Sequence, residues 1–343
     1  MSAGGFVVPE VAPEIVRAAC HSALVRAGVP SSHAELQVDL LVDAELKGRS
    51  SHGLLRLPRI VERIENGVTS PTATGIHAWR GLFLSVDGER GLGPVVTMTA
   101  LDALAKRLKR CGVGLAAINN NNHIGMLGFY AERLARRGFV LIGVSTSEAL
   151  VHPWGGRRAM LGTNPITIGV PTADRPFVLD MATSLVSMGQ IHDHANRRVP
   201  IPAGWALDAD GRPTTDAEAA KRGAIAPFGD AKGYALGLAL EVLVTSLTGA
   251  AIGRQVCGTL DSTKVCNKGD VFVLIDPAAA ASTASLITAY LDEIRSSGGD
   301  RPVAVPGDRA EEERVRRLRA GVLVPDELWN RIASLASGAE YIQ

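Results

Sequence analysis

The chain has 343 residues, 46% of them hydrophobic and 21% charged, so it is long enough for two or more domains and a large buried core. A formal net charge of +1 and an aromatic content of 4% exclude the basic, aromatic-rich surface typical of nucleic-acid-binding proteins. The four cysteines lie far apart with no Cys-x-x-Cys pair, and the first residues lack a basic-then-apolar signal pattern. We therefore expect free thiols and a cytoplasmic location.

The N-terminal part of the chain has the apolar spacing of helices. Residues 13–28 read as one amphipathic helix, and a second is expected to run to about Lys47. Ser32 and Glu35 have the spacing of a capping box at the start of that second helix. With a third helix that ends before Gly67, this predicts a helical layer of about three helices.

The third helix is expected after Gly53, because apolar residues recur at helical spacing from Leu54 to Ile64. Pro58 lacks an N–H and is expected to bend this helix near its first turn. Ser50 or Ser51 is suited to cap its front by accepting a backbone N–H.

His52 would then lie at the mouth of that helix, next to Ser51 and one turn from Arg56. An imidazole beside a hydroxyl and a guanidinium can bind a carboxylate and move a proton. On spacing alone, the alternative of a helix cap with an exposed histidine stays open.

Residues 69–74 form a Pro/Ser/Thr-rich loop and a plausible domain boundary, beyond which strands alternate with helices. Strands are expected near residues 82–86, 113–118, 139–144, 159–161, 166–170, 177–179 and 271–275, and helices near 94–108, 126–137, 233–247, 282–295, 311–319 and 326–336. Residues 197–220 are rich in Pro, Gly and Asp and predict a long surface loop. The pattern is mixed α/β without a run of clean βαβ units. The apolar stretch 233–253 contains Glu241, which favours a buried helix over a membrane span.

Several polar turns could bind a ligand. Asn119 to His123 follows an apolar strand and offers amides and an imidazole, while Gly125 permits close approach. The turn at residues 161–165 and the junction at 180–184 carry exposed N–H groups and hydroxyls suited to phosphate, and Lys232 stands at a helix mouth. Each of these also reads as an Asn-rich or capped turn, or as a solvated lysine.

Two kinds of site have no support in the sequence. No Gly-x-Gly-x-x-Gly opens a helix after a strand, and no Walker A motif is present, so a Rossmann fingerprint is missing. His192 and His194 form a His-x-His pair without an obvious third ligand nearby, so we expect no metal site.

Taken together, these blocks resemble the type-2, non-Rossmann malate/L-lactate dehydrogenase family over nearly the whole chain. That family also contains ureidoglycolate, sulfolactate and diketogulonate oxidoreductases and cyclic imino-acid reductases. The blocks that carry the resemblance are residues 51–53 with Arg56, 122–125, 155–156, 161–165, 180–184, 202–206, 213–216, 232–234 and 306–307. Each is unspecific alone, and their order and spacing are specific.

The resemblance implies an NAD- or NADP-dependent oxidoreductase, usually a homodimer, with no nucleic-acid or membrane partner. It implies a mostly antiparallel sheet in a cofactor and substrate domain (residues 75–308). It also implies a helical domain (residues 1–74) completed by residues 309–343. By analogy His52 is the proton donor and acceptor with Ser51 close by, Arg56 binds the substrate carboxylate, and His123 competes for the acid/base role. The cofactor-lining residues would be Thr163, Asn164, Ala182, Thr183, Ser184, Lys232, Gly233 and Gly307.

The chain departs from the family pattern in a few places. Ile60 stands where many relatives carry a tyrosine, which leaves the substrate open. Gln190, Asp230 and Asp308 replace a frequent lysine, glycine and glutamate. The choice between NAD and NADP also stays open, because the candidates for a 2′-phosphate contact are several: Arg157, Arg158, Arg309 and Arg314.

The implied reaction is hydride transfer between a nicotinamide and a small 2-hydroxy or 2-oxo acid of the malate, lactate or sulfolactate type. A neutral histidine with a pKa near 6.5 would take the hydroxyl proton, while a guanidinium fixes the carboxylate. The alternatives are reduction of a cyclic imino acid such as pyrroline- or piperideine-2-carboxylate, or a ligand-binding protein that has lost turnover.

Overall fold

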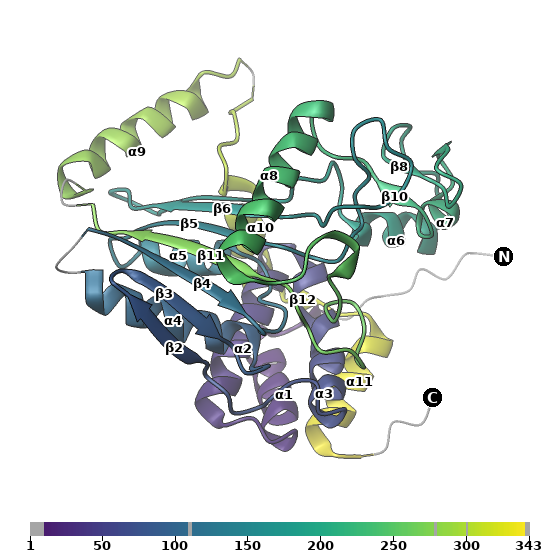
Figure 1. Cartoon of the computed structure of the whole chain (residues 1–343), viewed down its shortest axis with the longest axis horizontal. Coiled ribbons are helices and arrows are strands. Elements are labelled where there is room, and N and C mark those ends of the chain that lie inside the picture. The colour runs from purple at the N-terminus through teal and green to yellow at the C-terminus, as the bar shows by residue number, and fades with distance from the viewer. Residues whose placement is uncertain (1–9, 109–111, 278–279, 300, 340–343) are drawn as a thin grey trace.

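The computed structural model describes residues 10–108, 112–277, 280–299 and 301–339. A helical layer is built from both ends of this part of the chain: α1 (Pro13–Arg26), α2 (Ser31–Leu46), α3 (Leu57–Glu65), α10 (Asp308–Ala320) and α11 (Asp326–Ser337). Helix α11 packs on α1, and α10 packs on α2 (Figure 1). Strand β1 (Glu10–Val11) pairs antiparallel with β12 (Val322–Leu323) and joins the two ends.

The central sheet has seven strands in the order β2-β3-β4-β11-β5-β6-β7. Its strands are β2 (Ile76–Arg80), β3 (Phe83–Asp87), β4 (Val113–Asn119), β5 (Val140–Ser145), β6 (Ile166–Val170), β7 (Phe177–Met181) and β11 (Asp270–Ile275). The β3–β4 pair is parallel, and the other five pairs are antiparallel. The expected mixed α/β fold on a mostly antiparallel sheet is thus confirmed.

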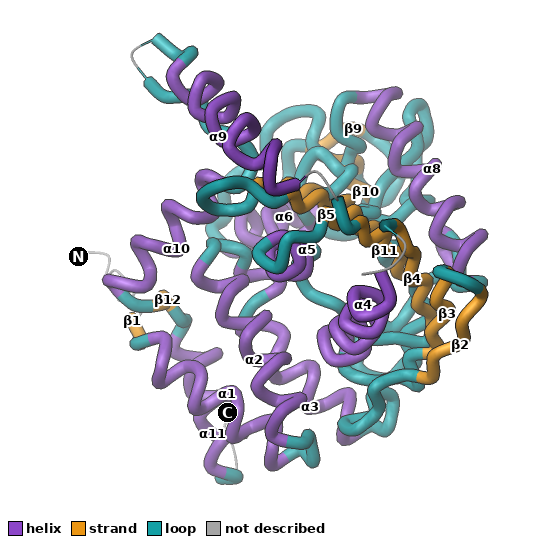
Figure 2. Tube along the Cα trace, turned by 90° about the vertical axis from the view of Figure 1, so that its left-hand side faces the viewer, coloured by secondary structure: helices purple, strands orange, loops and turns teal. Residues whose placement is uncertain are grey.

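Helices cover both faces of this sheet (Figure 2). Helices α4 (Gly93–Leu108) and α5 (Gly128–Ala135) lie on one face, and α8 (Asp230–Thr248) lies on the other. The alternation of strand residues divides β11 accordingly: Val271 packs with α8, whereas Phe272 and Leu274 join the main core. That main core continues into α1, α2 and α3, so the helical layer and the sheet share one buried interior.

A small lobe occupies part of the region expected to be a loop. It contains α6 (Met188–Asn196), β8 (Ala206–Leu207), β9 (Pro213–Thr214), α7 (Ala217–Ala220) and β10 (Ala224–Ile225). The expectation of an irregular loop over 197–220 was wrong, because Ile201, Ala206, Ala217 and Ala220 pack into a separate apolar cluster. The remaining helix, α9 (Ala280–Ser296), projects outward from the sheet (Figure 1).

Three local expectations were wrong. Helix α2 begins directly after Pro30 without a side-chain cap, so Ser32 and Glu35 form no capping box. Residues 50–56 form two 3₁₀ turns, η1 (Ser50–His52) and η2 (Leu54–Arg56), rather than a cap. Pro58 lies in the first turn of α3, where a missing N–H costs nothing, so it starts the helix rather than bending it.

Helix α8 packs closely on the turn that precedes it, and a buried carboxylate joins it to the turn before β6. A Cβ on Gly233 would lie 1.6 Å from the Phe228 carbonyl oxygen, so no larger residue fits there. The Glu241 carboxylate is buried and accepts a hydrogen bond from the Asn164 amide at 2.7 Å. Across the described residues, every helix is too short or too polar to span a bilayer.

Candidate active site

A buried carboxylate from α2 positions the loop that carries His52. Glu45 accepts hydrogen bonds from the Leu54 backbone N–H (2.8 Å) and the Ser50 hydroxyl (2.9 Å). A Cβ on Gly53 would lie 2.3 Å from a Glu45 oxygen, so glycine is required at that position. Arg317 of α10 donates to the Glu45 carbonyl oxygen at 2.7 Å. Burial raises the pKa of Glu45, and the hydrogen bonds from Leu54 and Ser50 favour its charged form.

The loop at residues 50–54 places His52 against His123, the other candidate histidine. The rings of His52 and His123 stack with centroids 5.3 Å apart and an interplanar angle of 14°. Burial, followed by the charges of Arg56 and Arg49, lowers the pKa of His52 to about 3. Burial and Arg56 also hold the pKa of His123 well below its ordinary value. The expected pKa near 6.5 was therefore wrong for the free protein, in which both imidazoles are neutral at pH 7.

A hydrogen bond defines which nitrogen of the His123 ring carries the proton. His123 Nδ1 accepts the Gly125 backbone N–H at 3.2 Å, so neutral His123 carries its proton on Nε2. His52 Nδ1 is buried and has no partner within the described part of the chain. The pair thus offers an N–H donor on His123 and an uncommitted nitrogen on His52.

Arg56 lies beside this pair. Its Nε donates to the Ser51 carbonyl oxygen (2.7 Å) and its Nη1 to the Thr259 carbonyl oxygen (3.3 Å). Burial lowers the pKa of Arg56 to about 10, so the guanidinium stays charged at neutral pH. Its other N–H groups have no acceptor among the described residues and can grip a carboxylate. A Cβ on Gly189 would lie 3.5 Å from Ser51, which places the start of α6 against this serine.

The asparagines at residues 119–122 precede His123, and the amide of Asn122 bonds to the protein rather than pointing to a ligand. The Asn122 side chain donates to the carbonyl oxygens of Arg90 (2.6 Å) and Gly91 (2.8 Å), and accepts from Arg63 (2.9 Å) and Thr69 (3.1 Å). All four of its hydrogen-bonding positions are committed to the protein.

A buried ion pair near His123 was missed in the sequence. Lys268 and Asp270 are both buried and bond at 2.5 Å, and Asp270 also accepts the Ser145 hydroxyl at 2.6 Å. The charge of Lys268 contributes to lowering the pKa of His123. The available signal was Lys-Gly-Asp at the start of an apolar strand, since buried charges of this kind are paired.

A cavity of about 480 Å³ lies between the end of α2, α5, β7, α9 and α10. Its lining includes Arg49, three residues before His52, and Met126, three residues after His123, but none of His52, Arg56 and His123 themselves. Its other lining residues include Lys47, Gly128, Glu132, Arg136, Arg175, Asp180, Arg295, Gly307, Asp308, Arg309 and Glu311. The cavity is therefore rich in cationic groups.

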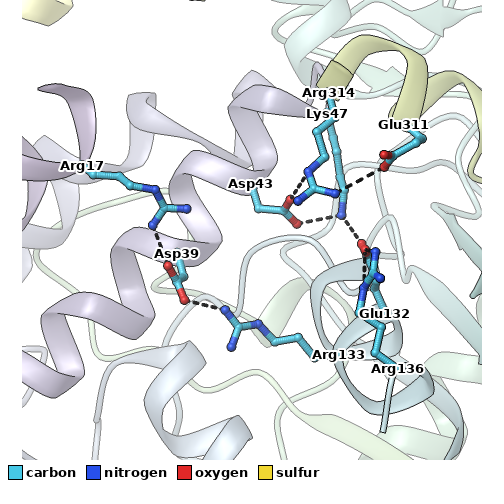
Figure 3. A network of polar contacts seen from close by, with 9 residues as sticks. All are labelled: Arg17, Asp39, Asp43, Lys47, Glu132, Arg133, Arg136, Glu311 and Arg314. Carbon is cyan, nitrogen blue, oxygen red and sulfur yellow. Dashed lines mark hydrogen bonds and ion pairs between the residues drawn. The ribbon is translucent and has the colours of Figure 1, made fainter. Parts of the chain in front are cut away.

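Many of these charges are bound to one another (Figure 3). Lys47 bonds to Asp43 and Glu132, and Glu132 bonds to Arg136. Although burial opposes it, Lys47 and Arg136 lower the pKa of Glu132 to about 2. Asp308 is bound by Arg175 and Arg295. Arg49 and Arg309 have no such partner among the residues that the structure describes.

The expected cofactor-lining residues fall into two places. Gly307 lines the cavity. The others, Thr163, Asn164, Ala182, Thr183, Ser184, Lys232 and Gly233, lie where two turns meet the start of α8. There the Phe228 N–H donates to the Thr183 carbonyl oxygen. The Thr183 hydroxyl donates to the Thr163 carbonyl oxygen (2.9 Å). Lys232 is exposed on the first turn of α8.

Of the remaining candidates, Arg309 lies at the cavity, whereas Arg157 and the His-x-His pair lie in the small lobe. Of the four arginines proposed for a 2′-phosphate, Arg309 lines the cavity, whereas Arg157 packs near Gly211 in the small lobe. His194 makes an edge-to-face contact with Trp205, and its Nδ1 lies 2.9 Å from the Gln190 carbonyl oxygen. Within the described ranges, no cluster of three or more His, Cys, Asp or Glu side chains gathers to hold a metal ion.

Comparison with known proteins gives a consistent match. The family model described as malate/L-lactate dehydrogenase matches residues 11–333. The chain is 34% identical to the malate/(S)-sulfolactate dehydrogenase of Methanothermus fervidus, covering 95% of this chain and 97% of that protein. It is 34% identical to the (2R)-3-sulfolactate dehydrogenase (NADP(+)) of Chromohalobacter salexigens, covering 90% and 93%. It is 32% identical to a Delta(1)-pyrroline-2-carboxylate/Delta(1)-piperideine-2-carboxylate reductase of Pseudomonas aeruginosa, covering 91% and 95%.

Solved structures share the fold. A dehydrogenase from Sinorhizobium meliloti is 51% identical, with a TM-score of 0.92 over 96% of this chain and 98% of that one. The sulfolactate dehydrogenase of Methanocaldococcus jannaschii is 33% identical, with a TM-score of 0.90 over 96% and 97%.

The neutral histidine pair can be tested in the free protein. We expect neither imidazole to take up a proton between pH 8 and pH 5, because a pKa lowered by burial keeps the neutral form down to more acidic pH. Ring-proton NMR over this range measures it, and His52→Gln and His123→Gln variants assign the two signals. A midpoint near 6.5 for either ring would contradict the burial argument.

Proposed function

Because the chain belongs to the malate/L-lactate dehydrogenase family, we propose that it is an NAD(P)-dependent dehydrogenase of small 2-hydroxy acids. The substrate would be of the malate, lactate or sulfolactate type. The observation that carries this proposal is the stack of two neutral histidines beside a half-buried guanidinium, some of whose N–H groups have no acceptor among the described residues.

The residues present fit a nicotinamide dinucleotide. The cavity offers Arg49 and Arg309 to negatively charged phosphates, and Gly307 has a left-handed backbone (φ 96°) that glycine favours. We propose that the cofactor extends from Gly307 toward the turns at the start of α8. There the proposed contacts are Thr163, Asn164, Ala182, Thr183, Ser184, Lys232 and Gly233. Such a group, when bound, supplies or accepts the hydride.

The protein residues would bind the acid and move its proton. Arg56 holds the C1 carboxylate, and Ser51 orients the oxygen on C2. In oxidation, neutral His52 accepts the hydroxyl proton. Burial is the main cause of the low pKa of free His52 and the charge of Arg56 is the second; a bound carboxylate offsets that charge and so favours the imidazolium. His123, with its proton on Nε2, is the competing donor in reduction.

We also propose that the two domains supply different parts of the site. The helical residues 1–74, completed by residues 309–343, would supply the proton-transfer and carboxylate-binding groups. Residues 75–308 would supply most of the cofactor site. A cytoplasmic location is supported by the free thiols of Cys20, Cys257 and Cys266.

The reaction class can be tested with a spectrophotometric panel. We expect NADH or NADPH consumption with at least one of oxaloacetate, pyruvate and sulfopyruvate, because Arg56 and the histidines suit a 2-oxo acid. Turnover confined to a cyclic imine would favour the alternative, an imino-acid reductase, which finds support in the Pseudomonas relative. Cofactor binding, seen as a change in NAD(P)H fluorescence, without turnover on the whole panel would indicate a non-catalytic binding protein.

The roles of the two histidines can be separated by substitution. We expect His52→Ala to lower kcat by about a hundredfold or more, since general acid–base catalysis contributes about that much. NAD(P)H binding, followed by fluorescence, should be unchanged. His123→Ala is the matched comparison, and wild-type turnover in His52→Ala would transfer the role to His123.

We also propose a homodimer, supported by an apolar face on α8. Leu236, Leu238, Val242 and Leu243 are exposed on this helix, with Val242 at 51%. Exposed apolar patches of this kind mark protein interfaces.

We expect Val242→Asp to halve the molar mass measured by light scattering, because a charge in an apolar interface is unpaired. Val315→Asp, at an exposed valine of α10, is the control and should leave the mass unchanged. A monomeric wild-type protein, or a dimeric Val242→Asp, would contradict the proposal.

A further inference from the structure

The loop at residues 259–262 lies along α3 and accepts hydrogen bonds from it. Three side chains donate to its carbonyl oxygens, one directly before α3, one within it and one directly after it. The pairs are Arg56 with Thr259 (3.3 Å), Arg63 with Asp261 (2.7 Å) and Asn66 with Ser262 (2.9 Å). The loop is therefore fixed on the helical layer from the beginning of α3 to its end.

A carboxylate from the sheet side of the molecule holds the start of this loop. Glu148 follows the end of β5 by three residues and is half-buried. Its Oε1 accepts the backbone N–H groups of Thr259 (2.8 Å) and Leu260 (2.9 Å) and the Thr259 hydroxyl (3.0 Å). Hydrogen bonds to a charged acceptor are roughly twice as strong as those between neutral groups. The start of the loop is thus joined both to the helical layer and to the sheet.

Glu148 and Arg56 bond to the same peptide group. The carbonyl oxygen of Thr259 and the N–H of Leu260 belong to one planar unit, and in a trans peptide they point in opposite directions. Arg56 donates to that oxygen, and Glu148 accepts that N–H. A rotation of this peptide would break both bonds. The Glu148 carboxylate therefore fixes the oxygen that the Arg56 guanidinium contacts.

Arg56 has two such contacts with the protein. Its Nε donates to the Ser51 carbonyl oxygen (2.7 Å), and its Nη1 donates to the Thr259 carbonyl oxygen (3.3 Å). Because the guanidinium is planar, two contacts on different nitrogens determine where its remaining N–H groups point. Burial and the charge of Arg59 lower the pKa of Arg56 to about 10, and the charge of Glu148 acts against both. Glu148 thus acts on Arg56 through the shared peptide and through its charge.

We propose that Glu148 is a positioning residue for substrate binding: through the peptide between Thr259 and Leu260, it holds the Arg56 guanidinium in the orientation that receives the C1 carboxylate. In this role Glu148 contacts neither the acid nor the nicotinamide. A two-pronged grip on a carboxylate depends on the plane of the guanidinium, and a displacement of about 1 Å can cost about a hundredfold in rate. This inference rests on the proposed function for the role of Arg56.

A double-mutant cycle on equilibrium binding tests this role. Racemic malate and lactate are titrated calorimetrically into protein saturated with NADH or NADPH, whichever binds more tightly; a hydroxy acid and a reduced cofactor cannot react. The proteins are wild type, Glu148→Ala, Glu148→Gln, Arg56→Gln and the double variant Glu148→Ala/Arg56→Gln. Circular dichroism shows that each variant is folded.

Asp208→Ala is the matched control. Asp208 is half-buried in the small lobe, and its carboxylate also accepts two backbone N–H groups, those of Asp210 and Arg212 (2.9 Å each). Its loss removes the same kind of bond away from Arg56, so acid binding should be unchanged.

We expect wild type to bind at least one of the two acids, and Glu148→Ala to weaken that binding about tenfold or more, the size of a lost charged hydrogen bond. Glu148→Gln should bind within about threefold of wild type, because its amide oxygen still accepts the loop N–H groups. The double variant should bind no more weakly than Arg56→Gln, since Glu148 acts through Arg56. Losses that multiply in the double variant, no loss or tighter binding in Glu148→Ala, or no binding in wild type would overturn the inference.

Turnover separates this inference from the proposed function. In Glu148→Ala we expect KM for the 2-oxo acid to rise by a larger factor than kcat falls, with NAD(P)H affinity unchanged in fluorescence titration. Acid binding that couples Glu148 to Arg56, without NAD(P)H consumption on any acid, would keep the positioning role in a carboxylate-binding site and refute the dehydrogenase. Turnover that is unchanged in Glu148→Ala would keep the dehydrogenase and refute the role of Glu148.

Discussion

The site depends on one buried carboxylate, that of Glu45, and on the loop that it holds. Its oxygens accept from Leu54 and Ser50, and its backbone accepts from Arg317 of the C-terminal helix α10. Hydrogen bonds to a charged group contribute about 1.5–3 kcal/mol each, which offsets part of the cost of burying the carboxylate. Residues 50–54 are thereby fixed on α2, and with them the positions of Ser51 and His52. The requirement for glycine at 53 follows from the same contact.

Burial explains the electrostatic character of the site. It keeps His52 and His123 neutral while Arg56 stays charged, because the pKa of an arginine starts far above neutrality and that of a histidine does not. A neutral imidazole can accept a proton at neutral pH. An incoming anion beside Arg56 then removes part of the field that disfavours the imidazolium. In the proposed mechanism, binding and proton transfer would in this way be coupled through the Arg56 guanidinium.

Local sequence patterns were sufficient for most of the long elements. Apolar periodicity predicted α4, α8 and the central strands β4, β5 and β11 close to their observed bounds. The spacing of His52 and Arg56 put the two side chains one turn apart, but on its own it left open whether they form a site. The small lobe was missed because its strands have two residues each, too few to show a period, and because Pro, Gly and Asp interrupt its apolar pattern.

Other features depend on contacts between distant segments, which no local pattern contains. Thr259 lies 203 residues from Arg56, and its carbonyl oxygen helps to fix that side chain. The lowered pKa of His52 arises from burial between segments that meet only in the folded chain. The asparagines before His123 show the same dependence: the sequence left open whether they bind a ligand or form a turn, and in the structure the Asn122 side chain bonds to the carbonyl oxygens of Arg90 and Gly91.

A crystal structure with NADP+ and a bound 2-oxo acid tests the account most directly. The account predicts a nicotinamide ring in contact with the space between His52, His123 and Arg56, with the substrate carboxylate on Arg56 and the adenosine end near Gly307. A nicotinamide ring bound away from both imidazoles, in either protomer of the assembly, would contradict it.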